Sequence, residues 1–251
     1  MNRKDTIRPW AVAVWLLVWQ LAAMAVGREI LLPSPLRVLT RLGELVVQGE
    51  TWLAILHSLA RIGGGFLLGL VTATLLALCA SRFRAVRELM SPLMLAIKSV
   101  PVASFVILAL VWVSSKNLAV LIVFLMVLPV MYLNVLDGVD RLDRRLSEMA
   151  RVFRVPALRR ALRVNLPQVM PGFLTGCRLA LGLCWKAGAA AEVIGMPRGS
   201  IGEKLQQAKV YLDTPDLFAW TVVILLISRE FEQVMLWVLD EMGRRLSGRR
   251  N

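Results

Sequence analysis

The sequence predicts an all-α, polytopic membrane protein with about six transmembrane helices in a single domain, residues 1–251. Hydrophobic residues make up 57% of the chain and the mean hydropathy is +0.65, whereas apolar residues make up about half of a typical soluble domain. The apolar residues also gather in runs near the roughly 20 residues that a helix needs to cross a bilayer. Helix is the default for such runs, because an open sheet edge leaves backbone groups unpaired in lipid.

Five apolar runs are clear and one is weaker. In chain order, the expected spans lie near residues 9–26, 52–80, 91–113, 118–136, 167–193 and 217–239. Trp52 and Trp112 fall near the ends of two of these runs, and Trp220 and Trp237 near the ends of the last. Because amphipathic aromatic rings favour the membrane interface, these tryptophans support the expected boundaries.

The formal net charge of +13 could indicate a nucleic-acid partner, but the distribution of the charge argues against one. With the N-terminus inside, the inner segments hold 18 of the 30 lysines and arginines and the outer segments hold seven. Membrane proteins concentrate Lys and Arg in their short cytoplasmic loops. We therefore expect both termini to be cytoplasmic, with no nucleic acid bound.

Two outer segments have helical patterns of their own. In residues 33–50, Ser34 lies between two prolines, and the outer loop 195–216 contains Gly195, Gly199 and Gly202 before a short helix. The first segment predicts an amphipathic helix on the outer surface, from the spacing of its apolar positions: Leu36, Leu39, Leu42, Leu45 and Val46. The pattern of the second segment predicts a short helix lying on the same surface, through Ile201, Leu205, Ala208 and Tyr211.

The inner loop 137–166 contains a basic helix-turn-helix that continues to residue 167, with the sequence EMARVFRVPALRRALRVNLP over residues 148–167. It resembles the loop by which permease subunits of bacterial ABC importers bind their ATPase. The family pattern is Glu-Ala-Ala, three residues, Gly, nine residues, Ile, one residue, Leu-Pro. Matching residues stand here at Glu148, Ala150, Val164, Leu166 and Pro167. The LPSP sequence at 32–35, together with residues 57–69 and 176–192, is similar to the permeases of nitrate, sulfonate and taurine importers.

Two positions of the loop depart from the family pattern. Met149 replaces the first of the two alanines, and Arg154 replaces the Gly that makes the turn. Because a residue with a Cβ reaches positive φ less easily than Gly, we expect the chain to turn instead through Val155 and Pro156, with the proline opening the second helix. The resemblance implies that the following residues couple the chain to the ATPase: Glu148, Ala150, Phe153, Arg154, Ala157, Leu158 and Pro167. We expect the apolar residues among them to fill a groove on that partner.

The resemblance further implies the type I-like ABC importer permease fold in a bacterial inner membrane. A homodimer of this chain would then move a small, anionic solute resembling nitrate, sulfonate or taurine. The implied partners are cytoplasmic ATPase subunits, an extracytoplasmic substrate-binding protein and membrane lipid. No G-x-x-x-x-G-K-[ST] phosphate loop occurs in the sequence. We therefore expect no cofactor and no enzymatic activity in this chain, with ATP and Mg bound on a separate ATPase chain.

Charges within the apolar runs need a reason, because each costs on the order of 2.5 to 3.5 kcal/mol on insertion scales. Lys186, Arg178 and Glu192 in the fifth run are the candidates for the translocation path. Lys186 and Glu192 point about 240° apart on one helix and are not expected to pair. Each of the three charges either forms a structural pair, with Arg61 as one partner for Glu192, or contacts the path. Lys98 and Arg61 lie nearer span ends and can snorkel.

Two other classes of function, and one other class of substrate, stay open. A secondary transporter driven by an ion gradient usually shows paired half-repeats with broken helices, and none is visible in the sequence. A membrane-embedded enzyme needs a cluster of catalytic side chains, and His57 is the only histidine. Permeases similar to this one also carry non-anionic solutes such as thiamine-precursor pyrimidines, so the sequence does not fix the substrate.

Overall fold

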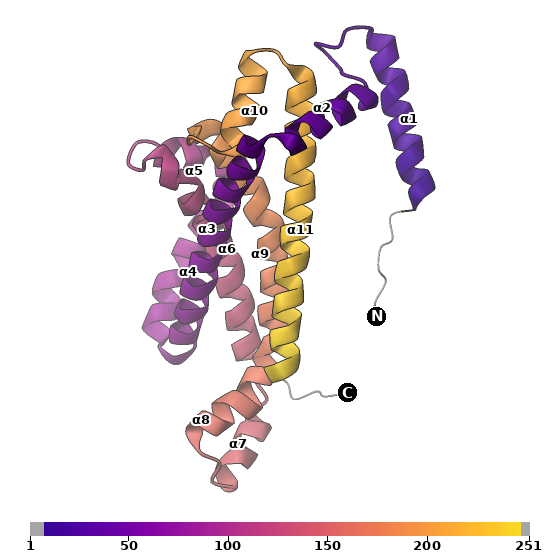
Figure 1. Cartoon of the computed structure of the whole chain (residues 1–251). Helices are drawn as coiled ribbons and strands as arrows, with labels where there is room; N and C mark the ends of the chain where they lie inside the picture. The colour runs from indigo at the N-terminus through magenta and orange to yellow at the C-terminus, as the bar shows by residue number, and fades with distance from the viewer. Residues whose placement is uncertain (1–7, 247–251) are drawn as a thin grey trace.

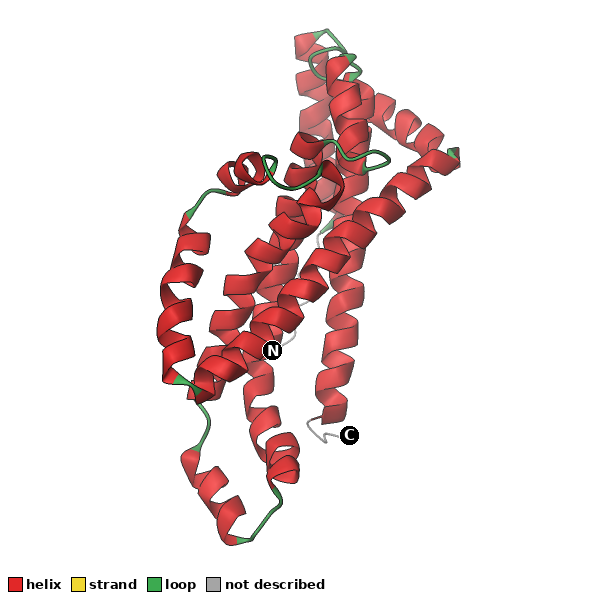
Figure 2. Ribbon diagram, turned by 90° about the vertical axis from the view of Figure 1, so that its left-hand side faces the viewer, coloured by secondary structure: helices red, strands yellow, loops and turns green. Residues whose placement is uncertain are grey.

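A computed structural model describes residues 8–246 of the chain, and within this range all regular structure is helical (Figures 1 and 2). The predicted all-α class is therefore confirmed. The helices, in chain order, are α1 Pro9–Val26, α2 Pro35–Val47, α3 Gly49–Arg82, α4 Arg84–Ser99, α5 Val102–Ala109, α6 Ser115–Asp140, α7 Arg144–Val152, α8 Ala157–Arg160, the π-helical turn η1 Ala161–Asn165, α9 Leu166–Gly195, α10 Ile201–Val210 and α11 Thr214–Leu246.

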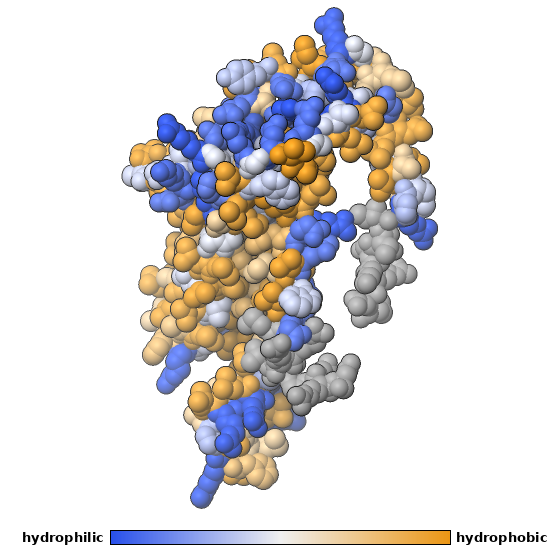
Figure 3. All heavy atoms as spheres, in the orientation of Figure 1, coloured by the Kyte–Doolittle hydropathy of each residue, from blue (hydrophilic) through white to orange (hydrophobic). Residues whose placement is uncertain are grey.

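Three helices of the described residues, α1, α3 and α6, are long and apolar enough to cross a membrane, and a fourth span is possible if α4 and α5 count as one. Helices α9 and α11 have 30 and 33 residues, which is long enough to cross a membrane at 1.5 Å per residue. Neither is among the helices that are both long and apolar enough to do so. The total of six spans therefore stays a prediction. Polar residues gather at the two ends of the molecule, with apolar residues between them (Figure 3).

The span predicted near residues 91–113 is not one continuous helix in the structure. Helices α4 and α5 meet at an angle of 101° around Val100 and Pro101. A residue that precedes proline is pushed out of the helical region, and Val100 accordingly has the extended angles φ −84° and ψ 132°. The chain therefore breaks here even though the run of apolar residues continues.

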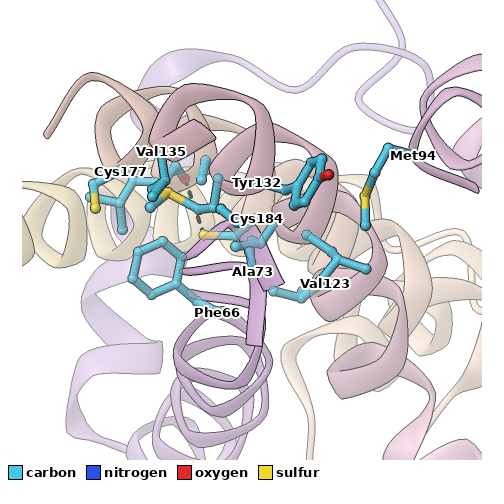
Figure 4. Close-up of a cluster of buried hydrophobic side chains, with 14 of the residues drawn as sticks. Phe66, Ala73, Met94, Val123, Tyr132, Val135, Cys177 and Cys184 are labelled. Carbon is cyan, nitrogen blue, oxygen red and sulfur yellow. Dashed lines mark hydrogen bonds between the residues drawn. The ribbon is translucent and has the colours of Figure 1, made fainter. Parts of the chain in front are cut away.

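Helices α3, α6 and α9 form the packed centre of the molecule, with a core that includes Phe66, Val123, Tyr132 and Cys184 (Figure 4). Gly65 allows the close approach of α3 and α6, because a Cβ there would lie 2.6 Å from the carbonyl oxygen of Val120. Small residues in this way let helix backbones approach closely.

The predicted outer amphipathic segment is found as α2, which lies against α11 near its first turns (Figure 1). The Ser34 hydroxyl caps α2 by accepting a hydrogen bond from the Arg37 N–H at 3.3 Å. The buried face differs from the expected one, since Val38 and Leu45 are buried while Leu36 and Leu39 are exposed.

Helix α1 stands apart from the other helices (Figure 1). Its contact with them runs through Trp19, whose Nε1 donates to the Pro33 carbonyl at 3.1 Å and whose ring packs at 5.6 Å from that of Phe218. Its surface is apolar and largely exposed, as expected for a helix surrounded by lipid.

The outer loop 195–216 contains the predicted short helix, α10. Ser200 caps α10 by accepting from the Glu203 N–H at 2.9 Å, while the Glu203 carboxylate accepts from the Gly199 N–H. The pair resembles a capping box, except that Glu203 accepts from the residue before the N-cap rather than from the N-cap itself. Ile201, Leu205 and Ala208 are buried as expected, whereas Tyr211 is exposed.

Candidate solute path and coupling loop

The helix-turn-helix predicted for ATPase coupling is present as α7, α8 and η1, and it projects from one end of the molecule (Figure 1). Asp143 caps the start of α7, where its carboxylate accepts from the Arg145 N–H at 2.8 Å. Pro167 lies in the first turn of α9, as expected from the spacing. The loop is therefore continuous with one of the central helices.

The expectation that the turn avoids positive φ at Arg154 is wrong, since Arg154 has φ +52°. The Arg154 N–H donates to Arg151 at 2.9 Å and the Val155 N–H donates to Ala150 at 2.9 Å. These two bonds form a Schellman motif. They satisfy carbonyl groups at the end of α7 and so offset the strain, on the order of 1–2 kcal/mol, of a left-handed residue with a Cβ.

The surface of this loop carries several exposed apolar side chains. Phe153 is 74% exposed, Leu158 is 73% exposed, and Val152 is exposed as well. Glu148 and Ala157 are also exposed. Ala150 is only 4% exposed in the single chain, and its carbonyl accepts the hydrogen bond from Val155 in the turn. Its contact with a groove on a partner stays a prediction.

A cavity of about 480 Å³ opens between α4, α6 and α9. Lys98 reaches it from the last turn of α4, and Arg178 and Lys186 reach it from α9. Positions 178 and 186 lie eight residues apart on one helix face, which places their backbones about 12 Å apart along the axis. The other lining residues are Pro129, Val130, Leu133, Asn134, Leu179, Gly182 and Leu183.

The cavity has an excess of positive charge. Arg178 donates to the Asp240 carboxylate of α11 at 3.1 Å. It therefore forms a structural pair, as considered from the sequence, and it also lines the cavity. Among residues 8–246, no ion pair involves Lys98 or Lys186. The Lys98 and Lys186 side chains are exposed in the single chain, and opposite charges attract each other. The arrangement is therefore suited to holding an anion.

Glu192, the third candidate path residue, does not line this cavity. Its side chain is buried and pairs with Arg61 at 3.4 Å, which is the partner considered from the sequence. The Ser58 hydroxyl donates to Glu192 at 2.5 Å and accepts from the Ile201 N–H at 3.0 Å. The three side chains thus join α3, α9 and the start of α10.

A second cavity, of about 350 Å³, lies between α2, α10 and the first turns of α3 and α11. Its cations are already paired, because Arg41 bonds Glu44 at 2.6 Å and Asp216 at 2.8 Å, and Lys204 bonds Glu50 at 3.0 Å. The bond to Glu44, with the contact to Asp216, raises the pKa of Arg41. Because these charges balance, the second cavity is the weaker candidate for an anion.

Sequence reasoning identified Arg178 and Lys186 as candidates for the path but not Lys98, Asn134 or Gly182. Lys98 was assigned to a span end from which it could snorkel. A lysine, an amide and a glycine on separate stretches of sequence give no joint signal, because only the packing of α4, α6 and α9 brings them together. An uncompensated charge in an apolar run was the one signal that the sequence offered for Lys98.

The chain is similar to known transport proteins. Residues 65–229 match the family model described as binding-protein-dependent transport system inner membrane component. A putative aliphatic sulfonates transport permease of Bacillus subtilis is 26% identical, over 86% of this chain and 79% of its own length. A probable ABC transporter permease of Brucella melitensis is 31% identical, over 78% and 79%. A bicarbonate transport system permease of Synechococcus elongatus is 25% identical, over 91% and 87%.

The names of the relatives cover more than one solute, because a formylaminopyrimidine transport permease of Halalkalibacterium halodurans also matches. What they share is a role as the membrane-embedded, transporting subunit. The match of the family model covers well over half of the chain and includes the central helices α6 and α9. The chain therefore belongs to the family of inner membrane components of binding-protein-dependent ABC transport systems, of the nitrate and sulfonate type.

Proposed function

We propose that this ABC importer permease carries a small anionic solute through the cavity between α4, α6 and α9. The single observation that carries the proposal is the set of Lys98, Arg178 and Lys186 around one cavity, with only Arg178 paired to a carboxylate in the described part of the chain. Sulfonates and bicarbonate, which appear in the names of two relatives, are anions. A neutral solute would gain little from the two unpaired ammonium groups.

We also propose that the helix-turn-helix binds the ATPase subunit. Its exposed apolar side chains, Val152, Phe153 and Leu158, suit an apolar groove, since burial yields about 25 cal/mol per Å² of apolar surface. Exposed Arg151 and Arg159 flank them and suit an acidic rim. Because η1 leads directly into α9, a displacement of the loop by the ATPase would move the helix that carries Arg178 and Lys186.

Two copies of the permease would complete the transporter, together with two ATPase subunits and a binding protein. The side of α9 that carries Arg178, Leu183 and Lys186 is exposed in one copy, and a second copy facing it would enclose the cavity. In this arrangement α7 and α8 lie on the cytoplasmic side, and so do both termini. The outer side then carries α2 and α10, where a binding protein would deliver the solute.

Removing one cation tests the anion path. We expect Lys186→Met to reduce uptake per permease molecule at least about tenfold, since a loss of about 1.4 kcal/mol in anion binding corresponds to a factor of ten. The matched control is Lys116→Met, because Lys116 is exposed at the start of α6 and lines neither cavity. The measurement is the initial uptake of the radiolabelled anion carried by the binding protein, in vesicles that contain the complete importer.

The amount of folded permease is measured in the same vesicles. A loss of folded protein with unchanged uptake per molecule would assign Lys186 to structure. Equal uptake by the Lys186→Met and Lys116→Met variants would contradict the anion path.

A further inference from the structure

Gly182 lies on the cavity face of α9, one turn from Arg178 and one turn from Lys186. A Cβ built at Gly182 meets no atom within 4 Å. The space in front of this glycine is therefore part of the cavity rather than a contact between helices.

Other glycines of α9 differ in this respect. A Cβ at Gly176 would lie 2.9 Å from the Asn134 Cβ, and one at Gly188 would lie 2.6 Å from the Ile62 Cγ1. Close helix packing explains why those two positions have no side chain. Packing within one copy of the chain does not explain Gly182, and a glycine inside a helix lowers its stability relative to alanine. What distinguishes Gly182 from Gly64, which also faces open space, is that Gly182 lines the cavity.

We propose that Gly182 sets the largest solute that the cavity admits. The inference rests on the proposed function, because it takes the cavity to be the solute path. In this arrangement the anionic group of the solute lies against Lys186 and Lys98, while the body of the solute occupies the gap that Gly182 leaves beside Arg178. The solute is thus a compact anion whose uncharged part is small enough to fit the space that a side chain at position 182 would otherwise fill.

A cysteine at position 182 tests access and charge without knowledge of the natural solute. The variant is Gly182→Cys in a Cys79→Ala background, because Cys79 is exposed whereas Cys177 and Cys184 are buried. The probes are two methanethiosulfonates, the negative sulfonatoethyl reagent and the positive trimethylammonioethyl reagent. We expect the negative reagent to react at least tenfold faster, and Lys186→Met to reduce that preference several-fold.

The outcomes separate the two proposals. If neither reagent modifies the cysteine in the assembled importer, the gap is closed and the role of Gly182 is overturned. If both reagents react at the same rate, the gap is open but the cations do not govern it, and the anion path of the proposed function is overturned instead.

Substitution by larger residues tests the size limit directly. We expect Gly182→Ala to keep at least half of the native uptake per molecule and Gly182→Leu to keep less than a tenth. ATP hydrolysis stimulated by the loaded binding protein and the amount of assembled complex should stay near native in both variants. Gly64→Leu is the matched control, because Gly64 also faces open space but does not line the cavity. Native uptake by Gly182→Leu, or equal losses in the Gly182→Leu and Gly64→Leu variants, would overturn the proposal.

Discussion

Replacing Ser58 with alanine should destabilise the permease more than any other removal of a single hydroxyl group that we consider. The Ser58 Oγ donates to the Glu192 carboxylate at 2.5 Å and accepts from the Ile201 N–H at 3.0 Å. Both Ser58 and Glu192 are buried. The Ser58→Ala variant would therefore lose a hydrogen bond to a carboxylate and leave one buried N–H without an acceptor.

The magnitude follows from these two losses. A hydrogen bond to a charged group contributes about 1.5–3 kcal/mol, and a buried group left unsatisfied costs about 1–3 kcal/mol. Arg61 still pairs with Glu192 in the Ser58→Ala variant, so we expect a total of about 2–4 kcal/mol. At about 2–4 °C per kcal/mol for a chain of this size, the midpoint of thermal unfolding should fall by roughly 5–15 °C.

The assay is thermal unfolding of the purified permease in detergent, followed by the loss of monodisperse protein. The matched control is Ser81→Ala, whose hydroxyl makes an exposed bond to Leu78, and we expect that change to stay within about 0.5 kcal/mol. Equal midpoints for the Ser58→Ala and Ser81→Ala variants would refute the reasoning that the buried network joins α3, α9 and α10.

Three further predictions concern the turn, the helix packing and the coupling loop. Arg154→Gly should slow hydrogen exchange at the Val155 amide, and Arg154→Val should speed it. The reason is that the left-handed conformation costs a β-branched residue more free energy than it costs arginine, and costs glycine less. The opposite order of exchange rates would contradict the Schellman turn. Gly65→Ala should destabilise the fold by about 1–3 kcal/mol through overpacking against α6, whereas Gly64→Ala should be neutral or stabilising in the same unfolding assay. Leu158→Asp should abolish co-purification of the ATPase while the permease still inserts, and retained co-purification would argue against docking through this loop.

Much of the fold can be predicted from hydropathy and from helix start signals, as α2, α3 and α6 illustrate. The bend at Pro101 could not be predicted from the length of the apolar run, because two short helices at 101° have the same composition as one long helix. The turn at Arg154 was missed for a different reason. The expectation took account of the free-energy cost of positive φ for a residue with a Cβ. It did not take account of the two hydrogen bonds, from the Arg154 and Val155 N–H groups, that offset this cost.

The candidate site could be predicted only in part. A charge inside an apolar run is conspicuous, and this property alone identified Arg178, Lys186 and Glu192. Burial then separates Glu192 from the other two, because it is enclosed with Ser58 and Arg61 while Lys186 borders a cavity. Whether a charged residue is enclosed or borders a cavity depends on which helix faces pack together. The periodicity of a single helix does not contain that information.

The most direct test of the anion path is a charge series at Lys186, read as uptake per permease molecule in vesicles with the complete importer. The variants Lys186→Arg, Lys186→Met and Lys186→Glu have side chains of similar length and charges of +1, 0 and −1. We expect uptake near native for Arg, at least about tenfold lower for Met and lowest for Glu, because a cation attracts the solute and a carboxylate repels it. Uptake that is the same in all three variants, or that falls as strongly for Arg as for Glu, would contradict an anion path at Lys186.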